Sequence, residues 1–263
     1  LVRSRGLGDV YKRQFFKRRI IRLHPMVIVG SIVGAVFFYF QESPCFPAIQ
    51  DTSAGTMLLV MLLGCTLLPL PLKWDIRGWT EMHPLNGPAW SLYYEYIGNI
   101  LYALFIRKFS KTALSVLVVV AGCFTVHLCL TAPAGDIVGG WALNWEQQYV
   151  GLVRLMYPFF GGLLLSRLGW LVRIEKRAFW WCSLMIVAVL AFPRLGGENH
   201  YWMNGLYEAC CILFVFPVIV SMGAGGKVTG KRSTAVCKFL GDISYPVYIT
   251  HYPLVYTYTA WVC

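Results

Sequence analysis

Long runs of apolar residues, separated by short polar connections, follow one another along most of the chain. A helix that crosses a bilayer needs about 20 consecutive, mostly apolar residues. Runs that approach this length predict eight membrane segments, at 23–41, 54–72, 89–106, 112–131, 148–166, 178–193, 201–222 and 240–262. No stretch long enough for a soluble domain remains between them. The pattern therefore predicts an all-α fold, a polytopic transmembrane helical bundle that forms a single domain over residues 15–263.

The composition agrees with a membrane location. Hydrophobic residues make up 57% of the 263 residues and charged residues 13%, with a mean hydropathy of +0.59. A soluble domain carries about 25% charged residues, so this chain has too few charges to coat a globule. This balance excludes a disordered chain, an ordinary nucleic-acid-binding domain and a simple soluble enzyme. The net charge of +11 then fits basic cytoplasmic loops, and we expect no nucleic-acid partner.

Lysine and arginine gather in alternate connections, which places those connections in the cytoplasm. The predicted cytoplasmic stretches are 17–22, 107–111, 167–177 and 227–238, and the predicted external ones are 42–53, 132–147 and 194–200. One conflict remains, because two predicted segments separate the connection at 42–53 from that at 107–111, where an odd number is needed. Either the segment 54–72 re-enters the membrane or residues 73–88 cross it. We favour re-entry, because this segment ends in Leu-Pro-Leu-Pro-Leu and proline breaks helices.

The two chain ends point to a fragment. Leu1 stands where a native chain starts with Met, and Cys263 closes the chain inside an apolar run. Residues 1–14 have neither the apolar core of a signal peptide nor a helical period, so we expect them to be a non-native or disordered lead-in. The nine cysteines show no metal-binding spacing. We therefore predict no metal site and interpret most cysteines as small buried residues.

Ionisable residues inside predicted segments are functional candidates, because a charge there costs at least about 2.5–3.5 kcal/mol. They are Glu95, His127, Arg154, Glu208, Asp242 and His251. Glu95 and Arg154 lie at similar depths from the external side. We expect these two residues to pair, either as a structural bridge or through a substrate. His127 and Glu208 are interpreted as structural, and Asp242 as a helix cap.

Two segments carry a polar face that should point into the protein. Within 86–95, Asn86 can cap a helix, and Ser91 and Glu95 follow at i and i+4. Within 240–251, Tyr248 and His251 follow Ser244 at i+4 and i+7. An aromatic belt at the membrane interface explains terminal tyrosines equally well, but it does not explain a histidine in the middle of a span.

A basic cluster leads into the first segment. Most such clusters only set topology. Arg19 and Arg22 lie at i and i+3 on one face at the cytoplasmic boundary, which also suits them to bind the phosphates of a cytoplasmic donor.

Taken together, these patches resemble acyltransferase family 3, the polytopic membrane O-acyltransferases of bacteria. The resemblance rests on Arg19-Ile-Ile-Arg22-Leu-His-Pro25, on Trp90-Ser91-Leu92-Tyr-Tyr-Glu95, on Arg154 before Gly161-Gly162, and on Leu240-Gly241-Asp-Ile-Ser244-Tyr245-Pro-Val-Tyr248-Ile-Thr-His251. Order and spacing agree from about residue 15 to the end. Each motif alone is weak, whereas the ordered set is fairly specific.

The resemblance implies transfer of an acyl group, commonly acetyl, from acyl-CoA to a hydroxyl of a cell-surface carbohydrate or related acceptor. Acyl-CoA would be a co-substrate, with no permanently bound cofactor. The implied location is a bacterial inner (plasma) membrane, with the lipid bilayer as surroundings and several passes across it. The rival interpretations are a secondary transporter, which also uses intramembrane charges and broken helices, and a non-catalytic membrane protein. Paired hydropathy repeats would favour a transporter, and none is visible.

The resemblance also suggests roles for individual residues. Arg19 and Arg22 correspond to the family's arginines at the CoA phosphates. Candidate catalytic residues are Glu95, Ser91 and His251, and the candidate substrate-contacting or structural residues are Trp90, Arg154, Tyr245 and Tyr248. The family's important histidine lies on a helix upstream of these arginines and has no counterpart here. We therefore expect eight of ten helices and an inactive fragment.

Overall fold

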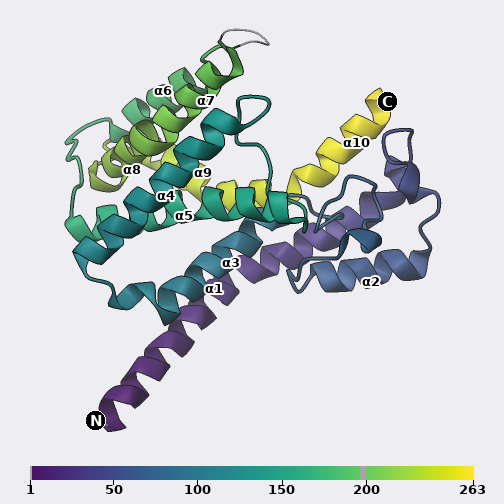
Figure 1. Cartoon of the computed structure of the whole chain (residues 1–263), viewed down its shortest axis with the longest axis horizontal. Coiled ribbons are helices and arrows are strands. Elements are labelled where there is room, and N and C mark those ends of the chain that lie inside the picture. The colour runs from purple at the N-terminus through teal and green to yellow at the C-terminus, as the bar shows by residue number, and fades with distance from the viewer. Residues whose placement is uncertain (1, 196–199) are drawn as a thin grey trace. The chain divides into compact units, whose positions relative to one another are not determined.

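A computed structural model describes residues 2–195 and 200–263, with side chains from residue 14 onward. These residues form helices and no strands, which confirms the all-α fold class (Figure 1). The α-helices are α1 (Val2–Phe37), α2 (Ala54–Gly64), α3 (Ala89–Leu104), α4 (Lys111–Thr131), α5 (Trp145–Leu168), α6 (Ala178–Leu190), α7 (Tyr201–Cys210), α8 (Phe216–Gly225), α9 (Lys231–Thr250) and α10 (Tyr252–Val262). A π-helical segment, Cys211–Val215, joins α7 to α8. Short 3₁₀ turns lie at Phe38–Gln41, Pro47–Ile49, Leu72–Trp74 and Ile106–Lys108.

Four helical stretches in the described chain are long and apolar enough to cross a membrane. They are Gln14–Gln41, Lys111–Thr131, Trp145–Leu168 and Tyr201–Gly225. The prediction of eight spans is therefore wrong by helix length. α2 has 11 residues, which gives about 16 Å at a rise of about 1.5 Å per residue, against a hydrocarbon core of about 30 Å. Helix α6 is similarly short, with 13 residues.

The predicted segment 240–262 is interrupted. Helix α9 ends at Thr250 and α10 begins at Tyr252, with His251 between them. Pro253 lies in the first turn of α10. Proline has no backbone N–H and would break one hydrogen bond of a continuous helix, but it is tolerated in the first turn of a new one. His251 consequently lies at a break between two helices and not in the middle of a span.

The region around 54–72 fits a segment that enters the membrane without crossing it. Ser53 caps α2 by accepting a hydrogen bond from the Thr56 N–H at 3.2 Å. The helix ends at Gly64, before the two prolines, and the only regular element from there to residue 88 is the 3₁₀ turn Leu72–Trp74. The alternative crossing through 73–88 has no helix to carry it. Re-entry of 54–72 stays a prediction.

Helix α1 begins upstream of the expected domain start. It runs from Val2, so residues 2–14, expected to be a non-native or disordered lead-in, continue this helix. Whether that lead-in is native to the protein stays a prediction, as does the domain boundary at residue 15.

The described chain divides into two compact units. The first comprises residues 1–99, 141–145 and 243–263, and the second comprises 100–140 and 146–242. In the first unit, Phe38, Phe46 and Tyr256 lie in a buried apolar cluster between α1, the loops after it and α10. Gly34 of α1 allows the backbone of the loop before α3 to approach closely. A Cβ at this position would collide with the carbonyl oxygen of Leu85, so α1 and this loop fit together only with glycine here.

Helices α4 and α7 pack along each other within the second unit (Figure 1). Gly205 of α7 faces the carbonyl oxygen of Cys129 on α4, where a Cβ would collide. A separate buried cluster forms between α4 and α5 around Leu114 and Phe160. The opposite side of α4 exposes Val116, Val119 and Phe124, as expected for a helix that faces lipid.

The cysteines only partly match their predicted role. Cys129 and Cys211 are buried, whereas Cys123 and Cys210 are exposed. Cys45, in the loop after α1, forms a disulfide with Cys263 at the end of α10.

Candidate functional site

Residues of α1, α3 and α9 that belong to the first unit bring the sequence motifs together. Nη1 of Arg19 on α1 lies 3.7 Å from Oε1 of Glu95 on α3. The expected placement of Arg19 at the cytoplasmic boundary and of Glu95 towards the external side is therefore wrong for at least one of the two residues. Tyr245 on α9 donates its hydroxyl to the carbonyl oxygen of Leu23 on α1 at 2.6 Å. Motifs separated by more than 200 residues in sequence therefore meet on α1, α3 and α9.

Ser91 and Tyr248 form the closest contact among the candidate residues. Their hydroxyl oxygens lie 2.5 Å apart. Both are also within reach of the Pro88 carbonyl oxygen, at 3.1 Å from Ser91 and 3.3 Å from Tyr248. Each hydroxyl has one proton to donate. The hydroxyl that donates to the Pro88 carbonyl oxygen must therefore accept the hydrogen bond of the other hydroxyl. The arrangement fixes both side chains at the start of α3, where Pro88 ends the preceding loop.

The break between α9 and α10 orients His251. Its Nδ1 lies 2.8 Å from the carbonyl oxygen of Tyr248, and its ring centroid is 5.3 Å from that of Tyr252. The ring of Tyr248 lies 6.1 Å from that of His251. The second predicted polar face thus reaches Ser91 through Tyr248, with His251 beside it.

The Trp-Ser-Leu-x-x-Glu helix begins differently from the prediction. The side-chain oxygen and nitrogen of Asn86 are buried and have no hydrogen-bond partner in the described structure, so the predicted side-chain cap is wrong. Gly30 of α1 receives this side chain, and a Cβ there would lie 2.4 Å from Nδ2 of Asn86. Trp90 is half-buried and packs edge-on against Tyr94, with centroids 6.0 Å apart.

Two arginines near the middle of α1 line a pocket suited to phosphate groups. A pocket of about 210 Å³ is lined by Gln14, Phe15, Arg18 and Arg19. The Arg19 guanidinium lies over the Phe15 ring at 5.6 Å. Arg22, the second arginine predicted to bind CoA, is exposed and does not line this pocket. Arg18 does, and the sequence motif did not single it out.

Arg154 belongs to the second unit and has a backbone partner there. Its Nη1 donates to the carbonyl oxygen of Gly139 at 2.6 Å. Glu95 belongs to the first unit and contacts Arg19. Pairing between Glu95 and Arg154 therefore stays a prediction.

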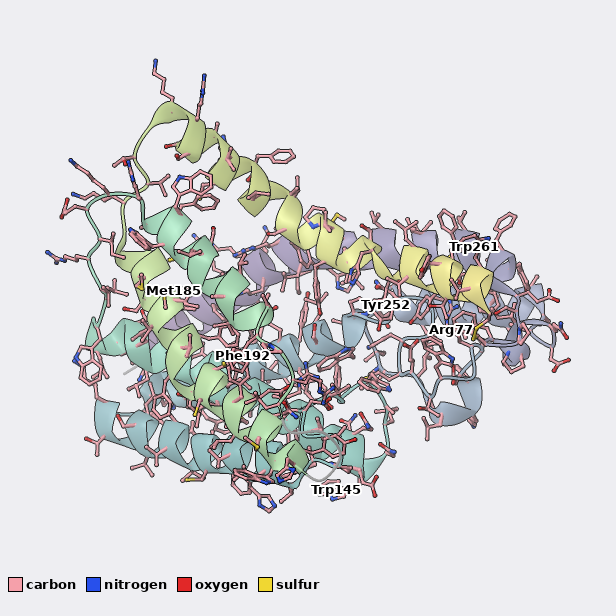
Figure 2. The ribbon with its side chains drawn as sticks, turned by 90° about the horizontal axis from the view of Figure 1, so that it is seen from above. Arg77, Trp145, Met185, Phe192, Tyr252 and Trp261 are labelled. Carbon is pink, nitrogen blue, oxygen red and sulfur yellow. A yellow bond between two sulfur atoms is a disulfide. The ribbon has the colours of Figure 1, made fainter. Side chains whose placement is uncertain are left out.

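Sequence reasoning missed a buried polar cluster in the loop between α2 and α3. Arg77 is fully buried and lies beside α10, with its guanidinium carbon 3.7 Å from the centroid of the Tyr256 ring (Figure 2). It donates to the Pro84 carbonyl oxygen at 2.9 Å and to Oε1 of Gln41 at 2.8 Å. Tyr256 in turn donates to Oε2 of Glu81 at 2.5 Å. This Arg77 cluster connects the 3₁₀ turn Phe38–Gln41, the loop and α10.

Burial shifts the ionisation of two residues of this loop. It raises the pKa of Glu81 to about 7, although the Tyr256 hydroxyl and the Arg77 guanidinium oppose the shift. Burial also lowers the pKa of His83 to about 3, so the imidazole is neutral at physiological pH. Both ring nitrogens of His83 lack a hydrogen-bond partner in the described structure. Only the density of charged and aromatic residues within 73–83 could have drawn attention to the loop.

The described residues contain no group of three or more His, Cys, Asp or Glu side chains suited to a metal ion. The donor groups that the site does gather are hydroxyls, an imidazole and guanidinium groups. Such groups bind anions and orient hydroxyls, which suits acyl transfer.

Comparisons with known proteins agree with the motifs. Neither a comparison with curated proteins nor one with solved structures gave a match. The profile of acyltransferase family 3, described as an acyltransferase domain, matches residues 7–263. This match covers nearly the whole chain, including every motif of the site. The chain belongs to acyltransferase family 3.

Proposed function

We propose that this membrane protein transfers an acyl group, acetyl in the simplest case, from cytoplasmic acyl-CoA to a hydroxyl of a cell-surface carbohydrate or related acceptor. The observation that carries the proposal is the meeting of Arg19 with Glu95 beside the Ser91–Tyr248 contact. The arginine motif expected to bind the donor and the helix expected to carry the chemistry thereby belong to one site.

The reaction has three physical requirements. The acceptor oxygen attacks the thioester carbonyl carbon, the C–S bond breaks, and the CoA thiolate leaves. A base removes the acceptor proton, donors stabilise the developing oxyanion, and cations hold the CoA phosphates. We assign phosphate binding to Arg19 and Arg22, with Arg18 as an added contact. Tyr248 and His251 are the proposed donors to the oxyanion.

Glu95 and Ser91 take supporting roles in this proposal. Glu95 holds the Arg19 guanidinium in place. The Ser91 hydroxyl is shared between Tyr248 and the Pro88 carbonyl, and no histidine nitrogen is recorded within hydrogen-bond distance of it among the described residues. This supports Ser91 as a positioning residue for Tyr248 and not as a nucleophile that becomes acylated.

Radiolabelled acetyl-CoA, supplied in proteoliposomes to this chain joined to a helix that carries the family's histidine, tests the proposal. The chain alone, which has no counterpart of that histidine, is expected to be inactive in the same assay. Labelled ester on a carbohydrate acceptor, with release of one free CoA per ester, is the expected result. Tyr248→Phe should lower the rate without changing the amount of folded protein. Tyr258→Phe on α10, which is 64% exposed, is the matched control. Uptake of an intact solute without CoA release would contradict the proposal and favour the transporter interpretation.

A further inference from the structure

The second unit contains a cleft that none of the site residues described above lines. It has a volume of about 360 Å³ and lies between the end of α6, the stretch after α6, α7 and the π-helical segment. Pockets that hold small molecules measure about 300–1,000 Å³. The α6–α7 cleft, as we call it, is therefore large enough for a ligand of the size of one sugar ring.

Two stacked aromatic rings form one wall of the α6–α7 cleft. The rings of Phe192 and Tyr207 stack with centroids 4.4 Å apart and planes inclined by 15°. Tyr207 is held in place because its hydroxyl donates to the Val189 carbonyl oxygen at 2.8 Å. Phe192, in the stretch after α6 (Figure 2), remains 45% exposed. A flat apolar surface of this kind packs well against the C–H face of a pyranose ring.

The polar groups of the cleft are held by the backbone. Glu208 accepts the Ile137 N–H through Oε2 at 3.0 Å. Asn204 accepts from the Leu195 N–H at 2.7 Å and donates to the Leu195 carbonyl oxygen at 2.9 Å. Arg194 donates to the Ala134 carbonyl oxygen at 2.6 Å and pairs with Asp136 at 3.2 Å. These groups are positioned before any ligand arrives, which reduces the entropy cost of binding.

Two further observations mark the cleft as functional. Glu208 lies within a helical stretch that is apolar enough to cross a membrane, and an ionisable residue there is costly unless it has a use. The π-helical segment Cys211–Val215 contributes Cys211 and Ile212 to the lining. Such π-bulges occur often at functional sites.

We propose that the α6–α7 cleft binds an uncharged carbohydrate, and that this carbohydrate is the hydroxyl acceptor of the proposed reaction. Carboxylates accept hydrogen bonds from sugar hydroxyls, whereas an arginine and an amide N–H donate hydrogen bonds to sugar oxygens. The cleft therefore offers both the acceptors and the donors that a sugar needs. Asp136 and Arg194 already neutralise each other, so neither offers an uncompensated charge to a charged ligand. Asp136 and Arg194, which line the cleft, belong to connections that are expected on the external side. This identity of the ligand rests on the proposed function.

A quaternary ammonium ligand is the competing chemistry, because a carboxylate and aromatic rings also bind such cations. Arg194 disfavours it, since its guanidinium lines the same cleft. The experiment must therefore separate a polyol from a cation.

Binding can be measured without catalysis. The full chain is placed in lipid nanodiscs, free of glycoside detergents, and titrated with methyl β-D-glucopyranoside and with methyl N-acetyl-β-D-glucosaminide by saturation-transfer NMR. Phe192→Ala should weaken binding by about tenfold, equal to about 1.4 kcal/mol. Glu208→Gln should weaken it as well, while its amide oxygen still accepts the Ile137 N–H and preserves the fold. The matched controls are Phe214→Ala, with a side chain that is 67% exposed, and Glu175→Gln, which pairs with Lys227.

The outcomes separate this inference from the proposed function. Loss of glycoside binding in Phe192→Ala and Glu208→Gln, with the two controls unchanged, supports the cleft. Equal binding by all variants overturns it, as does binding of tetramethylammonium in place of both glycosides. Absence of any glycoside binding also overturns it. Binding of acyl-CoA, measured on the same samples, reports on the proposed function alone and does not depend on Phe192 or Glu208.

Discussion

The guanidinium of Arg19 contacts the carboxylate of Glu95 at 3.7 Å. The arginine comes from the middle of α1, and the carboxylate comes from the second turn of α3. Both side chains are about one-third exposed, so a phosphate group can reach the guanidinium while Glu95 holds it. An exposed pair of this kind adds only about 0–1 kcal/mol to stability, which indicates a role in positioning more than in folding.

Replacing Arg19 should therefore damage donor binding and spare folding. We expect Arg19→Ala to raise the KM for acyl-CoA about tenfold, which corresponds to about 1.4 kcal/mol, with an unchanged thermal unfolding midpoint. Arg19→Lys should restore only part of the affinity, because an ammonium cannot bind phosphate oxygens bidentately. Arg173→Ala, at another exposed cytoplasmic position, is the control. An unchanged KM in Arg19→Ala would leave this residue with a topological role only.

Ser91 and Tyr248 should act as one unit. Ser91→Ala and Tyr248→Phe each remove one hydroxyl of a contact 2.5 Å long, so the double variant should lose little more activity than the worse single variant. Residues in direct contact typically show coupling of about 0.5–3 kcal/mol. The measurement is a double-mutant cycle on kcat/KM. Fully additive losses would contradict the idea that Ser91 acts through Tyr248.

The Arg77 cluster should matter for folding. Arg77→Ala removes the partner of Gln41 and of the Pro84 carbonyl and leaves Glu81 without its neighbouring cation. Removing one member of a buried charge pair typically costs about 3–5 kcal/mol, so the unfolding midpoint should fall sharply. Lys73→Ala, at an exposed position of the same loop, should have little effect. Equal stability of the two variants would show that the cluster contributes nothing to the fold.

Stability should depend on pH through two residues with opposite signs. Glu81 has a pKa raised from 4.5 to about 7 in the folded protein. The folded state then binds the extra proton, so the contribution of Glu81 is present below about pH 4.5 and is lost as pH rises to about 7. His83 has a pKa lowered from 6.5 to about 3. Its contribution is present above about pH 6.5 and is lost as pH falls towards 3.

The two contributions oppose each other between about pH 4.5 and 6.5. Thermal unfolding of Glu81→Gln and His83→Leu at pH 5 and 7 separates them. The midpoint difference between the unsubstituted protein and Glu81→Gln should shrink from pH 5 to pH 7. The difference from His83→Leu should grow over the same interval. Differences that stay constant with pH in both variants would contradict the assigned ionisation.

Spacing along the sequence predicts which residues share a helix face better than it predicts where a helix ends. Ser91 and Glu95 share a face because helical spacing alone places them there, and the position of Tyr248 follows from the same rule on its own helix. The structure shows that these two faces meet, which periodicity does not predict because it describes each helix separately. Hydropathy runs overcounted the spans, because an apolar run does not reveal where a helix ends, as at Gly64.

The Arg77 cluster could not be predicted for a different reason. Its contacts join Arg77 to Gln41, 36 positions away, and Tyr256 to Glu81, 175 positions away. A fully buried arginine looks, in sequence, like any basic residue of a loop. Only the folded structure shows that aromatic rings on three sides and two oxygen acceptors replace the water around its charge.

The disulfide between Cys45 and Cys263 turns most of the chain into a covalent ring. It joins residues 218 positions apart, so the ring contains the whole second unit and the part of the first unit that follows Cys45. A single proteolytic cut anywhere from residue 46 to 262 would leave the two products attached, and they would separate on a gel only after reduction. Such a ring also limits how far the unfolded chain can expand, which typically adds about 2–4 kcal/mol to stability. Formation of the ring needs an oxidising compartment, which agrees with the external side expected for residues 42–53.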